Sequence, residues 1–290
     1  MSVPESETQN STSSPASASG PSSRTTLIAA FAGTAVLAGV VAAGAAMPAV
    51  GSMAAIANTA IDSFNSFPTR LGDPILPQRS IITDAKGDTI AYLWEQNRVN
   101  VPINKISPKM QQAIVSIEDS RFYEHNGVDV RGTARALVAN QGSGEIQQGG
   151  STITQQYVKM ILLNNARTEA QQKAATERSP ERKLREARFA IAMEKQKTKE
   201  QILNGYLNIA YFGSGAYGVE AAARRYFGHS ANKMSVVEAA TLAGIVQSPV
   251  GYDPLVNPEA STTRRDAVLA TMEAQDVITP EQYQKAVATP

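Results

Sequence analysis

The stretch SPKMQQAIVSIEDSRFYEHNG, residues 107–127, indicates that the chain folds mainly into helices. Its opening serine and proline form a favourable N-cap and first-turn pair. Met110, Ile114 and Ile117 then recur at the spacing of one helix face. The helical pattern continues after this stretch, so we predict a mainly α-helical domain over residues 106–275.

The adjacent carboxylates of Glu118 and Asp119 form the first candidate site. If the helix continues to the end of the stretch, Glu118 shares a face with Phe122 and His125, because residues four and seven apart are neighbours. Asp119 is rotated from that face by about 100°. A carboxylate beside apolar side chains is partly desolvated, which raises its pKa and suits a general base. The alternatives are a surface ion pair between Glu118 and Arg121, or a metal site with the two acids as ligands.

The stretch QQGGSTITQQYVK, residues 147–159, combines a glycine pair with the start of a helix. A glycine-rich turn that enters a helix offers free N–H groups to an anion. Neutral amides suit a sugar amide or hydroxyl, and a lysine one turn further on suits a phosphate. The alternative is an ordinary capped helix whose glutamines are solvated. The candidate residues of this stretch are Ser151, Thr152, Gln155, Gln156 and Lys159.

The segment from residue 157 to residue 199 is basic, with eleven Lys and Arg against five Asp and Glu, although the whole chain has a formal net charge of only +1. Beside a membrane such a segment suits lipid head groups or a pyrophosphate, and the alternative is a solvated helix face. We predict one long helix over residues 179–203. On it, Arg182 and Glu186 are i, i+4 partners. A carboxylate held among cations is better suited to orienting them than to acting as a base.

A fourth stretch, YLNIAYFGSGAYGVEAAARRYFG, residues 206–228, mixes aromatic side chains with glycines before an alanine-rich segment. The aromatics could pack on sugar rings, but close packing of small residues explains the pattern as well. A further helix is expected from Ser235, where S-V-V-E is a capping box completed by Glu238, to Q-S-P at residues 247–249.

The N-terminal part of the chain differs from the rest. Residues 1–24 are rich in Ser, Thr, Pro and Ala, and we expect a disordered cytoplasmic tail. Residues 25–57 carry no charge and exceed the roughly 20 apolar residues that a membrane-spanning helix needs. This length favours a single-pass anchor over a cleaved signal peptide, with the catalytic domain outside the cytoplasmic membrane. A linker, residues 58–105, would hold a β-hairpin over residues 79–101 that turns at D-A-K-G.

Composition excludes some kinds of site. The chain has no cysteine, so it has neither a disulfide nor a thiolate metal site. The nearly neutral charge gives no support for a nucleic-acid partner. Ser230 and Lys233 fit the S-x-x-K pattern of transpeptidases, but no K-T-G follows them, so a transpeptidase nucleophile is not expected here.

Taken together, these stretches resemble the peptidoglycan glycosyltransferase family, glycosyltransferase family 51, which includes the transglycosylase domain of class A penicillin-binding proteins. The family pattern E-D-x-x-F-x-x-H-x-G is matched at residues 118–127, G-G-S-T-[IL]-T-Q-Q at 149–156, and R-K-x-x-E at 182–186. The fourth motif is similar to residues 208–220, and the fifth to AATLAGIVQSP at 239–249. All five patterns occur in the family's order.

The resemblance implies a lysozyme-like, mostly helical fold with a membrane-proximal lobe. The reaction that it implies is polymerisation of lipid II into β-1,4-linked glycan strands, by inverting displacement of undecaprenyl pyrophosphate. The catalytic residues would be Glu118, which takes the proton of the acceptor 4-hydroxyl, and Glu186, which positions cations or sugar. Asp119 and His125 would orient the base and hold the local turn. The residues implied in substrate binding are Asp119, Phe122, His125, Ser151, Thr152, Gln155, Gln156, Lys159, Arg167, Arg182, Lys183, Asn208, Tyr211, Gly213 and Glu220, with Lys173 as a lesser candidate.

The resemblance implies no obligatory cofactor, but Mg²⁺ or Mn²⁺ could assist, and Glu118 and Asp119 are then the candidate ligands. The expected partners are lipid II, the nascent glycan chain, membrane lipid and other cell-wall synthesis or division proteins, and no nucleic acid. Residues 276–290 resemble the start of a linker to a transpeptidase domain. Two alternatives stay open: a lysozyme-like enzyme that cleaves glycan, and a non-catalytic membrane scaffold that binds cell-wall precursors.

Overall fold

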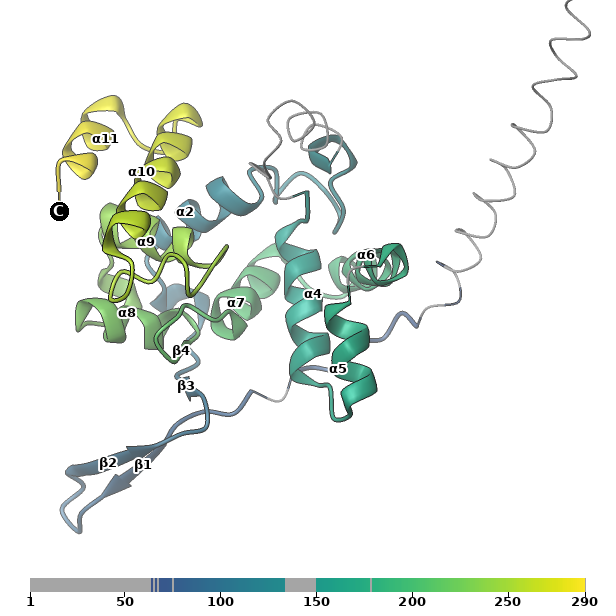
Figure 1. Ribbon diagram of the computed structural model, residues 1–290, viewed down its shortest axis with the longest axis horizontal. Helices are drawn as coiled ribbons and strands as arrows, with labels where there is room; N and C mark the ends of the chain where they lie inside the picture. The colour runs from purple at the N-terminus through teal and green to yellow at the C-terminus, as the bar shows by residue number, and fades with distance from the viewer. Residues whose placement is uncertain are drawn as a thin grey trace, which may run out of the picture. The chain divides into compact units, whose positions relative to one another are not determined.

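The computed structural model describes residues 64, 66, 68–74, 76–133, 150–177 and 179–289 (Figure 1). The predicted tail and membrane anchor, residues 1–57, lie outside these ranges. In the part of the chain that the structure describes, no helix is long and apolar enough to cross a membrane. The prediction of a mainly helical domain is confirmed, because helices dominate from Pro108 to Val287.

One group of helices is built around α2 (Pro108–Glu118), which packs against α9 (Val236–Ile245) and α10 (Pro258–Ala274). Helix α11 (Pro280–Val287), within the stretch expected to begin a linker, packs on α10 (Figure 1). Ser107 caps α2 through its hydroxyl, as predicted. The fully buried apolar side chains of this group include Met110, Ile114, Leu242, Val268 and Leu269. Their close packing holds α2 in place against α9 and α10.

A second group is built around α4 (Ile153–Asn164), which packs against α6 (Pro180–Glu194) and α7 (Lys199–Ile209). Helix α5 (Glu169–Thr176) also packs on α4. Figure 1 shows this group on the other side of the unit from α9, α10 and α11. The two groups leave the C-terminal end of α2 facing the N-terminal end of α4, and this is where the candidate site lies.

The prediction of one helix over residues 179–203 is wrong, because the chain turns between α6 and α7. The turn has a local cause. The Thr198 hydroxyl accepts a hydrogen bond from Gln201 N, and the Gln201 side chain accepts one from Thr198 N, which is a complete capping box. This box starts a new helix in the middle of a segment whose composition is helical throughout.

Helix α8 (Val219–Phe227) begins after Gly218 and ends at Gly228, which has the left-handed φ of 75° that glycine tolerates. The predicted helix start at Ser235 is confirmed by a capping box with Glu238. Two short parallel strands and two 3₁₀ helices complete this region: β3 (Asn97–Arg98), β4 (Ala216–Tyr217), η1 (Ile103–Lys105) and η2 (Ala231–Lys233).

The predicted hairpin is also confirmed. Strands β1 (Ser80–Thr83) and β2 (Thr89–Leu93) pair antiparallel. In the turn, Asp84 Oδ1 accepts hydrogen bonds from Lys86 N at 2.9 Å and from Asp88 N at 2.8 Å. An aspartate that bonds its own following backbone in this way favours a tight turn.

Candidate active site

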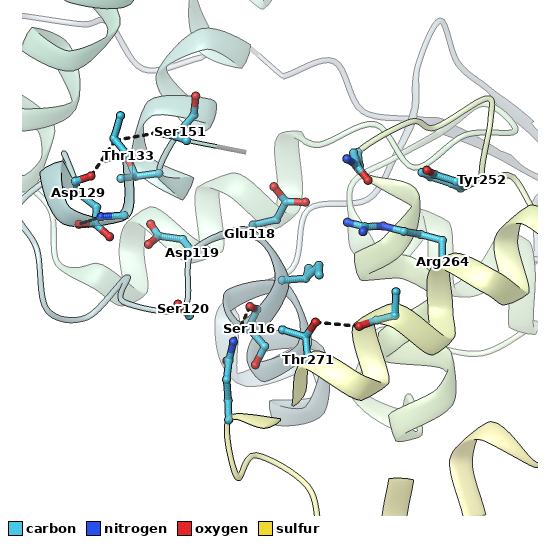
Figure 2. A pocket seen from close by; sticks show the side chains of 17 residues that line it. Ser116, Glu118, Asp119, Ser120, Asp129, Thr133, Ser151, Tyr252, Arg264 and Thr271 are labelled. Carbon is cyan, nitrogen blue, oxygen red and sulfur yellow. Dashed lines mark hydrogen bonds between the residues drawn. The ribbon is translucent and has the colours of Figure 1, made fainter. Parts of the chain in front are cut away.

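A cleft of about 530 Å³ lies where the end of α2 meets the start of α4 and one face of α10 (Figure 2). Three segments that the sequence analysis singled out contribute to it, namely those around Glu118, Ser151 and Gln247. The described residues that line it are Ser116, Ile117, Glu118, Asp119, Ser120, Asp129, Gly132, Thr133, Gly150, Ser151, Thr152, Gln247, Tyr252, Arg264, Ala267, Thr271 and Gln275.

Glu118 is the last residue of α2 and is partly buried in the wall of this cleft. Its Oε2 accepts a hydrogen bond from Gln156 Nε2 at 2.8 Å. Burial raises the pKa of the Glu118 carboxyl, and the Gln156 hydrogen bond and the Arg264 charge offset this only in part. The carboxyl group therefore has the elevated pKa that was predicted for a general base.

The predicted helix through His125 is wrong, because α2 ends at Glu118. Asp119 has φ −161° and ψ 74°, which is not helical, and the chain turns from there to Gly127. Consequently it is Asp119, and not Glu118, that contacts His125. The His125 Nε2 lies 2.9 Å from Asp119 Oδ2, and the same oxygen accepts a hydrogen bond from Ile153 N at 3.0 Å.

The ion pair proposed between Glu118 and Arg121 does not form. Arg121 pairs with Asp129 instead, with its Nε 3.0 Å from Asp129 Oδ2. Burial acts to raise the pKa of Asp129, but the hydrogen bond from Gly132 N and the Arg121 guanidinium outweigh it and hold that pKa below its usual range. Phe122 is completely buried, so its ring supports the turn from inside.

The two carboxylates of the acid pair point to different sides of the cleft. Figure 2 shows Glu118 pointing toward the side of Arg264 and Asp119 pointing toward the side of Asp129. Among the residues that the structure describes, no group of three or more His, Cys, Asp or Glu side chains could hold a metal ion.

The start of α4 supplies the next part of the site. Thr152 caps α4, and its hydroxyl also donates a hydrogen bond to Gly127 O at 2.7 Å. Gln155 completes the capping box with its Oε1 3.0 Å from Thr152 N, so this buried amide serves the helix start and does not line the cleft. Gln156 instead turns to Glu118. The neighbouring Gly149 lies outside the described residues.

Among the described residues of the basic segment, Lys183 reaches the cleft lining by way of Ser151. Lys183 Nζ donates to Ser151 Oγ at 2.8 Å and lies 3.4 Å from Glu186 Oε2. Arg182 forms an ion pair with the same carboxylate, which is 1% exposed. Glu186 therefore holds two cations in place behind Ser151. Lys159, Arg167 and Lys173 are exposed and do not line the cleft.

The fourth stretch lies outside the cleft, and its polar side chains bond within the fold. The Asn208 amide pairs with both the N–H and the C=O of Val101, each at 2.9 Å. Tyr211 packs on Tyr217 with 4.6 Å between ring centroids. Glu220 is buried and accepts hydrogen bonds from Ser230 Oγ and Ala231 N.

Gly213 belongs to the same stretch, residues 206–228, and is also closely packed. It has φ 83°, and a Cβ there would lie 2.8 Å from the Tyr226 hydroxyl and 3.0 Å from Asp253 Oδ2. The structure thus gives Asn208, Tyr211, Gly213 and Glu220 internal partners outside this cleft, and their role in substrate binding stays a prediction.

Sequence reasoning missed one whole wall of the cleft, which is formed by α10 and the segment before it. Arg264 is prominent there: its guanidinium carbon lies 5.8 Å from the Tyr252 ring centroid, and its buried Nε has no hydrogen-bond partner among the described residues. Gln275 Nε2 donates to Ser116 O at 3.1 Å and ties this wall to α2. The available signal was the spacing of Arg264, Ala267, Thr271 and Gln275, which places them on one helix face.

Comparison with known proteins identifies the family of this chain. The Transglycosylase family matches residues 86–273. Penicillin-binding protein 1A of Aquifex aeolicus is 43% identical over 214 residues, which cover 74% of this chain and 28% of that protein. Penicillin-binding protein 1A of Streptococcus pneumoniae is 40% identical over 211 residues, covering 73% of this chain and 28% of that protein. Penicillin-binding protein 1A of Escherichia coli is 39% identical over 202 residues, covering 70% and 22%.

A crystal structure of penicillin-binding protein 1A from Haemophilus influenzae aligns with a TM-score of 0.41 and 22% identity, over 76% of this chain and 21% of that one. The chain thus spans 22–28% of the length of the three relatives named above. From the family match over residues 86–273, we conclude that the chain belongs to the transglycosylase family of peptidoglycan glycosyltransferases.

Proposed function

We propose that this chain polymerises lipid II into β-1,4-linked glycan, with Glu118 as the base for the attacking hydroxyl. The observation that carries this proposal is the position of Glu118, which lies in the cleft wall, bonded to Gln156 and with its pKa raised by burial. A carboxyl group with a raised pKa is a better match for proton transfer near neutral pH than an ordinary glutamate.

The proposed step is a single displacement. The 4-hydroxyl oxygen of the acceptor sugar forms a bond to the anomeric carbon of the donor, while the bond from that carbon to the pyrophosphate oxygen breaks. The hydroxyl proton passes to Glu118, and undecaprenyl pyrophosphate leaves with both electrons of the broken bond. No covalent enzyme intermediate is required.

The leaving pyrophosphate needs positive charge and no proton, because it is already a weak base. Lys183 is placed to supply this charge, since its Nζ donates to Ser151 in the cleft lining. The buried ion pair of Arg182 with Glu186 supports it from behind. Lys159 and Arg167 are exposed and extend the candidate set for the phosphates and the lipid head groups.

A glycan-cleaving enzyme of lysozyme type is less well supported by the geometry. Such enzymes use two carboxyl groups, one as acid and one as base or nucleophile. Among the described residues that line the cleft, the carboxylates are Glu118, Asp119 and Asp129. Asp119 is held by His125 and Ile153 N, and Asp129 by Arg121 and Gly132 N. Glu118 is thus the one whose bonds leave it oriented into the cleft, which favours a reaction with a single base.

Product analysis with the purified full chain tests the proposal. Incubation with lipid II should yield glycan polymer and one undecaprenyl pyrophosphate for each new glycosidic bond, while finished peptidoglycan should stay intact. Release of soluble muropeptides from finished peptidoglycan would instead support the lytic alternative. Tight binding of lipid II with no polymer would support the non-catalytic scaffold.

We also propose the membrane placement that residues 25–57 predict, because both substrates carry polyprenyl chains that keep their reactive ends at a membrane surface.

We further propose that a divalent cation assists the reaction. With no group of three metal-binding side chains in the described ranges, Mg²⁺ or Mn²⁺ would reach the cleft mainly through the substrate pyrophosphate. Polymerisation measured before and after chelation, and then with each ion restored, tests this.

A further inference from the structure

A chain of two hydrogen bonds links the buried face of α7 to the candidate base. The Tyr206 hydroxyl donates to Gln156 Oε1 at 3.1 Å, and Gln156 Nε2 donates to Glu118 Oε2 at 2.8 Å. Tyr206 is completely buried, and Gln156 and Glu118 are partly buried. The three residues come from α7, α4 and α2, so the chain connects both helix groups.

The chemistry of the three groups gives these bonds a direction. An ionised carboxylate only accepts hydrogen bonds, so Gln156 must present its NH₂ to Glu118. The opposite end of the amide then presents Oε1, which needs a donor. Tyr206 is that donor, because burial raises its pKa well above the usual value and keeps the hydroxyl protonated.

Without the hydroxyl the amide would lose the bond that holds its Oε1 end in this orientation. A glutamine amide has nearly the same shape when it is turned by half a rotation, so orientation depends on its hydrogen bonds. The second bond of Gln156 Nε2, to Ser151 O at 3.4 Å, is long. In the turned orientation Oε1 would face Glu118, and two acceptors would oppose each other at the base.

We propose that Tyr206 is a positioning residue for the transfer step, acting through Gln156 to hold the Glu118 carboxylate in its acceptor orientation. This inference rests on the proposed function, because it assigns a role in the reaction that Glu118 carries out. It also gives a reason for tyrosine instead of phenylalanine at a site without exposure, where a hydroxyl would otherwise cost free energy to bury.

The charged groups around Glu118 limit what else could orient it. Arg264 faces it from α10, and Asp119 stands beside it in the chain. Asp129 is paired with Arg121 in the loop after α2, and the segment that follows α9 contributes the neutral Gln247 to the cleft lining. Of these groups only Arg264 is a free cation facing the carboxylate, and no hydrogen bond joins the two within the described part of the chain.

Tyr157 offers a matched control. It is 5% exposed, lies on α4 beside Gln156, and packs on Gly205. No hydrogen bond to its hydroxyl is found among the described residues. Tyr157→Phe and Tyr206→Phe therefore remove the same atom from two buried rings, and in Tyr206 that atom is the donor of a hydrogen bond to Gln156.

The experiment uses the purified full chain and lipid II. Tyr206→Phe should lower kcat roughly tenfold with KM little changed. The lost interaction orients the base and does not contribute to substrate binding. The acid limb of the pH–rate profile should move to higher pH, because Glu118 loses a hydrogen bond that favours its ionised form. Tyr157→Phe should keep kcat within about twofold of wild type and leave the pH profile unchanged.

Gln156→Ala tests whether Tyr206 acts through the amide. In that background Tyr206→Phe should have no further effect on kcat, whereas an equal fold-loss in both backgrounds would overturn the proposal. An unshifted acid limb in both Tyr206→Phe and Gln156→Ala would overturn it as well, and the second variant keeps the test valid if the first folds poorly.

Failure of the proposed function gives a different result. If the wild-type chain does not turn over lipid II, the proposed function is wrong. The relay, which is the hydrogen-bond chain from Tyr206 through Gln156 to Glu118, is still tested by NMR titration of ¹³C-labelled glutamate carboxyls. Tyr206→Phe should raise the pKa of Glu118, whereas Tyr157→Phe should leave the pKa of Glu118 as it is in the wild type. No change in the pKa of Glu118 would contradict the relay itself.

Discussion

The imidazole Nε2 of His125 lies 2.9 Å from Oδ2 of Asp119, and the same carboxylate oxygen accepts a hydrogen bond from Ile153 N. Asp119 therefore ties the turn after α2 to the first turn of α4. Because Glu118 precedes Asp119 and Gln156 follows Ile153, this link sets the spacing between the candidate base and the amide that bonds it.

Loss of this link should harm the site less than loss of the base. We expect His125→Ala and Asp119→Asn to lower polymerisation and to reduce stability by about 1.5–3 kcal/mol, the usual range for a hydrogen bond to a charged group. Glu118→Gln should lower polymerisation more than either. Turnover of lipid II and denaturant unfolding of the three variants check this, and a larger activity loss in His125→Ala than in Glu118→Gln would contradict the assignment.

The pH profile should reflect the environment of Glu118. A base must be ionised before it accepts a proton, so activity should fall as pH drops through the raised pKa of Glu118. Arg264 opposes that rise, so Arg264→Met should move the acid limb to still higher pH. Lipid II polymerisation measured across pH checks this against Arg225→Met, a change of an exposed arginine on α8. An acid limb that stays in place in Arg264→Met would contradict the electrostatic account.

Alanine substitutions at two glycines distinguish the cost of backbone strain from the cost of a steric clash. Gly87 and Gly127 both have φ 89°, but a Cβ would meet nothing within 4 Å at Gly87, and at Gly127 it would lie 2.7 Å from the carbonyl carbon of Ala190. Gly87→Ala should cost about 1–2 kcal/mol, which is the strain of a left-handed alanine. Gly127→Ala should cost about 1–3 kcal/mol more, because the turn must move away from α6. Chemical denaturation of both variants measures the difference, and equal losses would show that the contact with Ala190 relaxes freely.

Lys183, the cation beside Ser151, should contribute to binding of the donor pyrophosphate. Lys183→Met should weaken binding of a lipid pyrophosphate donor and reduce the dependence of that binding on salt, because one charge contact is lost. Lys159→Ala should weaken it as well. Lys285→Met, an exposed change on α11, should leave the affinity unchanged. If Lys183→Met and Lys285→Met bind the donor with the same affinity, Lys183 does not belong to the pyrophosphate site.

Features with local causes could be predicted from the sequence. The cap at Ser107 was recognisable from the Ser-Pro pair, and the cap at Ser235 was recognisable because a capping box is complete within four residues. The hairpin turn at Asp84 was recognisable for the same reason. The sequence motifs also singled out Glu118 and Ser151, which both line the cleft.

Features with distant causes could not be predicted in this way. The end of α2 depends on Asp119, whose partner Ile153 lies 34 residues further along the chain. A helical pattern alone could not reveal that the carboxylate would leave the helix to reach it. The α10 wall was missed because Arg264 and Thr271 belong to no short pattern and reach the cleft only through packing of α10 on α2.

The most direct test of the account is the turnover of lipid II by Glu118→Gln, measured beside Glu259→Gln, which changes an exposed glutamate at the start of α10. The account predicts that Glu118→Gln keeps the thermal unfolding midpoint of the wild type and loses about 10²–10⁴-fold in kcat, the usual contribution of a general base. Glu259→Gln should retain wild-type kcat. Near wild-type polymerisation by a folded Glu118→Gln variant would contradict the central claim.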